Sequence, residues 1–180
     1  MNYDSLFWFN PYFFLKGSVI IKILAYDQAS GCTGVAVFSD EKLIKYDVID
    51  LKRIKNDKDK RFKTMAVKIY EYIINEKPDI VVFEDVSLQT NVSTLLLLAQ
   101  IQGVIMQSCI VNGIPYKIYK PTSWRKILNF AQGRNIVRKQ LKQQAVDLVK
   151  DKYNINVKDD IADAICIGNA YIKEYLEASR

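Results

Sequence analysis

The chain has 180 residues, of which 49% are hydrophobic, and it contains no histidine. It carries 26 Lys and Arg against 20 Asp and Glu, a formal net charge of +6. The length fits one compact domain, and the missing histidine excludes a Ser-His-Asp relay, an HExxH zinc site and a His-ligated haem. Three widely spaced cysteines without a CxxC motif favour a reducing compartment, so we expect a cytoplasmic protein.

Three short strands are predicted in the first third of the chain. The β-branched and apolar run 19–26 ends at Asp27, residues 33–39 form a second strand, and residues 43–50 form a third. Short polar segments typical of tight turns separate them. Sequential strands joined in this way predict an antiparallel meander.

Strands and helices alternate in the rest of the chain. Residues 52–63 are charged and indicate a solvated connection, and a 3.6-residue apolar period predicts a helix over 62–75. The continuous apolar run 79–86 is typical of a central strand buried on both faces. The remaining predicted elements are a buried helix over 91–112, a strand over 114–119, a helix from about residue 122, and helices over 135–153 and 159–175.

This order of elements predicts an α/β fold. An antiparallel meander followed by strand–helix units gives a mixed five-stranded sheet with helices on both faces. That is the arrangement of the ribonuclease H-like fold.

Acidic side chains fall where the predicted elements meet. Asp27 ends the first strand and Glu84 lies near the end of the strand after the first helix, so adjacent strands would place them side by side. Asp160 and Asp163 are three residues apart and share one helical face. Asp159 is either a further ligand or only a helix cap. If the last helix crosses the sheet beside these strands, four carboxylates meet.

Four carboxylates at close range repel one another unless cations lie among them. Oxygen ligands without His or Cys select Mg²⁺, for which Mn²⁺ can substitute. Two such ions can clamp a phosphodiester, with one activating water and the other stabilising the leaving oxygen. Each acid alone is typical of a turn or a cap, so the prediction depends on the four together.

Four segments resemble the RuvC-type Holliday junction resolvases, and more closely their phage or plasmid branch. The resemblance covers about residues 21–170, and its most specific element is the D-x-x-D-A pattern that contains Asp160 and Asp163. The segments are ILAYDQASGCTG from Ile23, VVFE from Val81, AQIQG from Ala99 and DDIADA from Asp159.

The resemblance implies a metal-dependent endonuclease that resolves four-way DNA junctions as a homodimer, in recombination, repair or phage DNA processing. It implies two Mg²⁺ ions per active site and no nucleotide cofactor, and the helix over 91–112 as the dimer interface. Cellular members carry an aromatic residue three positions after the glutamate, where this chain has Ser87. The implied catalytic and metal-binding acids are Asp27, Glu84, Asp160 and Asp163.

The resemblance also divides the chain into an aromatic N-terminal extension, residues 1–18, and a RuvC-like nuclease domain, residues 19–180. Neither the extension nor the helix over 91–112 is expected to cross a membrane, because Asn10 and Pro11 interrupt the first and glutamines the second.

Basic residues in the last third of the chain are candidates for phosphate contacts. Arg134, Arg138 and Lys142 recur every four residues, which predicts one stripe on the penultimate helix; an ordinary solvated helix face is the alternative. Trp124 is expected in the core rather than as a base-stacking platform. The resemblance places the family's basic site residues near Arg125 and Arg138. The full set of DNA-binding candidates is Arg125, Lys126, Arg134, Arg138 and Lys142.

Three alternatives to junction resolution stay open. The first is a nuclease of broader selectivity for branched DNA. The second is a junction-binding protein that has lost catalysis, against which the four intact acids argue. The third is an actin-like ATPase, which shares this fold but needs two such domains where 180 residues supply one.

Overall fold

The computed structural model describes residues 21–54, 57–87 and 91–178. Within them five strands form one sheet in the order β3-β2-β1-β4-β5. The first three strands are antiparallel neighbours, whereas β4 runs parallel to β1 and β5 parallel to β4. This confirms the predicted mixed five-stranded sheet and its meander. The strands are β1 (Lys22–Asp27), β2 (Cys32–Ser39), β3 (Lys42–Asp50), β4 (Ile80–Glu84) and β5 (Tyr116–Tyr119).

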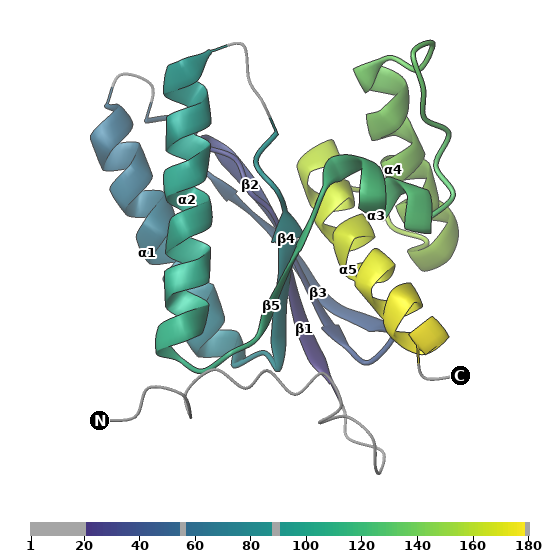
Figure 1. The fold of residues 1–180 in the computed structure, drawn as a ribbon, viewed down its shortest axis with the longest axis horizontal. Helices are drawn as coiled ribbons and strands as arrows, with labels where there is room; N and C mark the ends of the chain where they lie inside the picture. The colour runs from purple at the N-terminus through teal and green to yellow at the C-terminus, as the bar shows by residue number, and fades with distance from the viewer. Residues whose placement is uncertain (1–20, 55–56, 88–90, 179–180) are drawn as a thin grey trace.

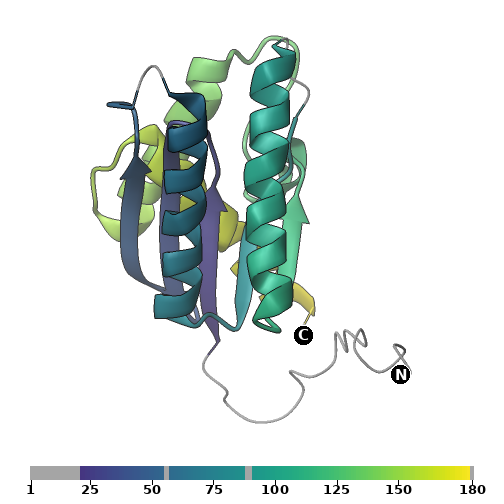
Figure 2. The same ribbon diagram turned by 90° about the vertical axis from the view of Figure 1, so that its left-hand side faces the viewer.

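Helices cover both faces of this sheet. One face carries the first two helices, which lie side by side, and the opposite face carries the last three (Figures 1 and 2). The N-terminal extension predicted at residues 1–18 lies outside the described residues. The helices are α1 (Lys58–Glu76), α2 (Val92–Val111), α3 (Pro121–Ile127), α4 (Arg138–Tyr153) and α5 (Asp159–Ala178).

Two helix starts differ from the sequence-based prediction because side chains cap them. Helix α1 begins at Lys58, four residues earlier than expected, since the Asp57 carboxylate accepts a hydrogen bond from the backbone N–H of Lys60. Helix α4 begins later than expected, since the Gln140 side chain accepts a hydrogen bond from the backbone N–H of Val137 at 2.9 Å. Part of the expected charged connection is therefore helical.

The two faces of the sheet have separate apolar cores. Successive side chains of a strand point to opposite faces, so Leu24 and Tyr26 pack under α1 and α2 whereas Ile23 and Ala25 pack under α5. Strands β1 and β4 are buried along most of their length, as their continuous apolarity predicts. The third core element is α5, which is buried from Ala162 to Ala170.

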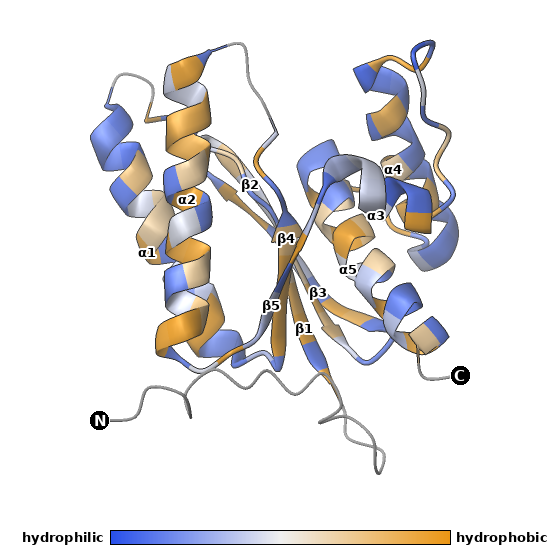
Figure 3. Ribbon diagram, viewed as in Figure 1, coloured by the Kyte–Doolittle hydropathy of each residue, from blue (hydrophilic) through white to orange (hydrophobic). Residues whose placement is uncertain are grey.

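The expectation that α2 is a buried helix is wrong. Only Ile101, Ile105, Ser108 and Cys109 are buried, and Leu96 is 60% exposed. The helix therefore carries apolar residues on its exposed side as well as on its buried side (Figure 3). Among the described residues it is the one helix long and apolar enough to cross a membrane by length and composition, but it packs against α1 and contributes to the core under the sheet.

Candidate active site

Two of the acids come from neighbouring parallel strands. Tyr26 of β1 pairs with Phe83 of β4, so the next residues, Asp27 and Glu84, leave the sheet level with each other at the same edge. Asp85 belongs elsewhere, because its carboxylate accepts hydrogen bonds from its neighbour Val86 and from a glutamine of α2. The side chains of Glu84 and Asp85 thus have different surroundings, as the alternation of side chains along a strand predicts.

The other two acids arrive on the first turns of α5, which lies directly against β2. A Cβ atom at Gly34 would lie only 1.9 Å from the backbone oxygen of Asp160, so no other residue fits there without movement. Gly34 is also the register partner of Asp27. Helix α5 therefore sets Asp160 and Asp163 beside the end of β1, and all four predicted acids come together.

Mutual repulsion and burial perturb these carboxylates. The pKa of Asp27 is raised well above its ordinary value, first by burial and then by Asp163, Glu84 and Asp160. Burial raises the pKa of Asp163 to about 7, although Arg125 opposes the shift. The pKa of Glu84 is also raised by burial. Three neighbouring acids whose pKa values are all raised form a site that favours positive charge.

Cationic side chains supply part of that charge. Arg125 of α3 approaches Glu84 Oε1 to 3.6 Å, and Lys52, in the connection after β3, approaches Asp160 Oδ2 to 3.8 Å. Lys52 was missed by the sequence reasoning, which assigned its segment to a solvated connection. The sequence has no periodic signal for Lys52, because only the packing of α5 on β2 brings the two segments together.

Asp159 is held outside the set of four. It is the first residue of α5, and its carboxylate accepts a hydrogen bond from Lys142 of α4. That hydrogen bond lowers the pKa of Asp159, and the same interaction raises the pKa of Lys142 against the effect of burial. Lys142 thereby lies over the acidic site itself, close enough to Asp160 and Asp163 to respond to their charges.

Trp124 is buried, as expected, but it has an additional role that the sequence does not signal. Its indole Nε1–H donates a hydrogen bond to Glu84 Oε1 at 2.8 Å. The Arg125 guanidinium carbon lies 4.6 Å from the centroid of the same indole. A buried tryptophan needs a partner for its N–H, and here that partner is one of the four acids.

The predicted basic stripe is only partly present. Arg134 lies in the turn before α4, so the stripe of Arg134, Arg138 and Lys142 on one helix is wrong. Arg138 is the first residue of α4 and lies near enough to Glu84 to lower its pKa against the effect of burial. Lys126 is an exposed residue in the last turn of α3. Of the five basic candidates, Arg125, Arg138 and Lys142 thus lie near the acids.

The donor set fits a hard divalent cation in its chemistry. All four groups are carboxylates, and the buried Gln28 Oε1 beside them has no hydrogen-bond partner among the described residues, as an atom that contacts a hydrated cation would. As the side chains stand, no group of three acidic or thiol residues in the described part of the chain is arranged to hold an ion. Ligation by three or more of these residues therefore requires rotation of their side chains.

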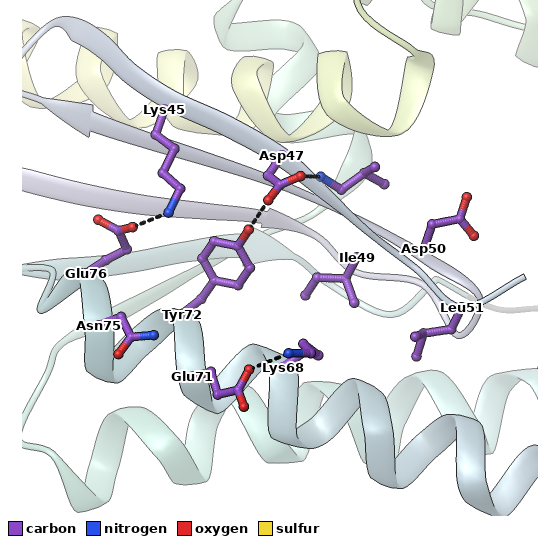
Figure 4. A pocket seen from close by; sticks show the side chains of 11 residues that line it. Lys45, Asp47, Ile49, Asp50, Leu51, Lys68, Glu71, Tyr72, Asn75 and Glu76 are labelled. Atoms are coloured by element: carbon purple, nitrogen blue, oxygen red, sulfur yellow. Dashed lines mark hydrogen bonds and ion pairs between the residues drawn. The ribbon is translucent and has the colours of Figure 1, made fainter.

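A separate groove of about 430 Å³ lies between β3 and α1, on the other side of the sheet from α5 (Figure 4). Both of its lysines are paired with glutamates, which leaves them little capacity for an anionic ligand. The pairs in the groove are Lys45 with Glu76, Tyr72 with Asp47, and Lys68 with Glu71.

Comparisons with known proteins find relatives of the whole described domain. The family model described as crossover junction endodeoxyribonuclease RuvC matches residues 23–170. The RuvC of Carboxydothermus hydrogenoformans is 28% identical over 152 residues, covering 83% of this chain and 94% of the relative. The RuvC of Geotalea uraniireducens is 29% identical over 161 residues, covering 84% and 91%.

Solved structures show the same fold. Thermus thermophilus RuvC in complex with a Holliday junction superposes with a TM-score of 0.70 at 14% identity, covering 87% of this chain and 96% of the other. The Fowlpox virus resolvase, solved with Holliday junction DNA, gives a TM-score of 0.59 at 18% identity, covering 87% and 99%. This chain thus shares its fold with these two resolvases. The placement on a phage or plasmid branch stays a prediction.

Proposed function

The chain belongs to the RuvC family of crossover junction endodeoxyribonucleases, and we propose that Asp27, Glu84, Asp160 and Asp163 are its catalytic acids. Members of this family are metal-dependent nucleases, and the chain resolves Holliday junctions by endonucleolytic cleavage. The bacterial origin of the relatives makes the cytoplasm the proposed place of action.

The observation that supports the acid assignment is their convergence from three elements that are far apart in the sequence. The raised pKa of Asp27, caused by burial and by the other three acids, indicates a group that needs a positive partner to ionise. We assign Mg²⁺ as that partner, with Mn²⁺ as a substitute and two ions per site. Bound ions of this kind supply activation of water and stabilisation of the leaving oxygen.

The chain's own cations have a second role in this proposal. Arg125, Lys142 and Lys52 balance the acids in the free protein, and each is placed to contact a phosphate at the same site. Lys126, Arg134 and Arg138 complete the proposed phosphate-binding set. Phosphate contacts of this kind position DNA without reading its sequence.

The exposed face of α2 is the proposed homodimer interface. Val92, Leu96 and Ile110 are 65%, 60% and 47% exposed, and exposed Ala99 and Gly103 lie between them at helical spacing. Spacings of three, four and seven residues place all five on one face of the helix. A contiguous apolar stripe of this length marks an association surface.

A nuclease of broader branched-DNA selectivity is the second candidate. It is favoured by Ser87, an exposed residue shortly after β4, at the position where the resemblance implies an aromatic contact with junction bases. Without that aromatic side chain, the protein lacks this contact with the junction bases, and its contacts with the DNA phosphates do not read sequence.

Cleavage of three DNA substrates in parallel distinguishes a junction resolvase from a broader branched-DNA nuclease. Purified protein is incubated with a four-way junction, a Y-fork and a linear duplex of matched sequence in Mg²⁺. Junction resolution predicts paired nicks in the four-way junction, a much slower reaction on the fork, and an intact duplex. Equal rates on fork and junction would favour the broader nuclease. No cleavage in Mg²⁺ or Mn²⁺, with retained junction binding, would contradict the enzymatic assignment.

A further inference from the structure

Helix α3 places one tryptophan against a candidate catalytic acid. Strand β5 pairs with β4 through Tyr119 and Glu84, and Pro121 begins α3 two residues later. The short connection fixes where α3 lies relative to the end of β4. Trp124 consequently reaches back from α3 to Glu84 with a direct 2.8 Å hydrogen bond.

The contacts around this pair hold the indole in place. Trp124 is fully buried, and Phe130 packs against its ring edge-on at a centroid separation of 5.7 Å. The guanidinium carbon of Arg125 lies 4.6 Å from the centroid of the same indole. A ring fixed on several sides has little freedom to follow a moving carboxylate, so the carboxylate must take the orientation that the ring allows.

The interactions of Glu84 are divided unequally between its two oxygens. Among the described residues, the hydrogen bond from Trp124 and the ion pair with Arg125 both fall on Oε1. A carboxylate held through one oxygen still presents the other to a cation. Mutation of a group that orients a metal ligand in this way typically costs about 10–100-fold in metal affinity or activity.

We propose that Trp124 is a positioning residue, which fixes the Glu84 carboxylate through Oε1 and so leaves Oε2 oriented for a divalent metal ion. The inference extends the proposed function, because it requires Glu84 to be a ligand. An indole suits this task because its N–H donates but carries no charge. It therefore orients the carboxylate without neutralising the charge that a cation needs, unlike a lysine or arginine in the same place.

The substitution Trp124→Phe tests the proposal, because it removes the N–H and keeps an aromatic ring. Metal binding is followed by the rise in melting temperature during a Mg²⁺ titration, with no DNA present. We expect the Mg²⁺ concentration at half-maximal stabilisation to rise about ten-fold or more. Junction cleavage should recover as Mg²⁺ is raised further, because the ligands themselves are intact.

Tyr119→Phe is the matched control. It also removes one side-chain hydrogen bond to a carboxylate, but that carboxylate belongs to Glu174, about three turns along α5 from Asp163. The control should therefore leave the Mg²⁺ midpoint unchanged. A folded Trp124→Phe protein with the wild-type midpoint would overturn the positioning role.

Glu84→Gln distinguishes this failure from failure of the proposed function. If Mg²⁺ raises the melting temperature of wild type and Glu84→Gln with the same midpoint, Glu84 is not a ligand and both proposals are wrong. If Mg²⁺ no longer stabilises Glu84→Gln while Trp124→Phe keeps the wild-type Mg²⁺ midpoint, only the positioning role of Trp124 is wrong.

A fluorescence measurement covers the case in which Trp124→Phe does not fold. Trp8→Phe leaves Trp124 as the one tryptophan of the chain. Its emission should change on Mg²⁺ addition, with the same midpoint as the thermal stabilisation. Emission that stays constant while the protein is stabilised would contradict the proposal.

Discussion

Adding one methyl group at Gly34 should displace two of the candidate catalytic acids. A Cβ atom there would lie 1.9 Å from the backbone oxygen of Asp160 and 2.6 Å from its carbonyl carbon. An ordinary C···O contact is about 3.3–3.6 Å, so the first turn of α5 must retreat by about 1.5 Å. The obstacle is backbone, which cannot rotate away as a side chain can.

The displacement is large enough to affect catalysis. A misplacement of about 1 Å at a reacting centre can cost about 100-fold in rate, and overpacking of a core contact costs about 1–3 kcal/mol of stability. We therefore expect Gly34→Ala to lower the single-turnover rate of junction cleavage by about 100-fold. Gel-shift binding should change little, because the basic residues around the acids lie on α3 and α4 and the turn between them.

Gly168→Ala provides the comparison on the same helix. Its added Cβ would meet the Phe38 ring at 2.2 Å, about 12 Å along α5 from Asp160. This variant should lose stability but keep its cleavage rate. A Gly34→Ala protein that folds and cleaves at the wild-type rate would refute the view that this close contact positions the acids.

Three further predictions concern DNA binding, stability and assembly. Arg138→Ala should weaken junction binding and reduce the slope of log affinity against log salt by about one; an unchanged slope would remove Arg138 from the phosphate-binding set. Burial opposes ionisation of Glu76, but hydrogen bonds from Lys22 and Lys45 lower its pKa overall. This carboxylate therefore stabilises the fold above its unfolded pKa of about 4.3 and stops doing so as pH falls through the lowered folded value. Glu76→Gln should accordingly cost about 1 kcal/mol near neutral pH, and urea denaturation should show that difference shrinking below about pH 4; an equal difference at pH 3 would contradict the ion-pair explanation. Leu96→Asp should convert a dimer into a monomer in sedimentation analysis, and a dimer that persists would place the interface elsewhere.

The strands and their acids were predictable because the relevant signals are local. Alternating or continuous apolar runs marked all five strands, and the acids Asp27 and Glu84 stood at strand ends where parallel neighbours present their side chains together. Asp160 and Asp163 were predictable as a pair from their spacing in one helix. Their approach to the sheet, however, depends on the missing side chain at Gly34, which a glycine in a strand does not reveal by itself.

The errors have three different causes: a long-range contact, a local helix cap and an ambiguous composition. Lys52 lies in a segment of mixed charge, and only the fold shows that it reaches Asp160. Arg134 has the right spacing for the helical stripe, but the hydrogen bond from Val137 to Gln140 starts α4 after it. Leu96 belongs to an apolar run that resembles a buried helix, because composition cannot distinguish a buried apolar side chain from an exposed one.

The central claim is that the four acids cut the junction, and Asp160→Asn tests it most directly. The substitution keeps the size of the side chain and removes the negative charge that a divalent ion requires. With a synthetic four-way junction in Mg²⁺, we predict that cleavage is abolished while gel-shift binding stays close to wild type. Cleavage by Asp160→Asn at the wild-type rate would contradict the assignment of this site.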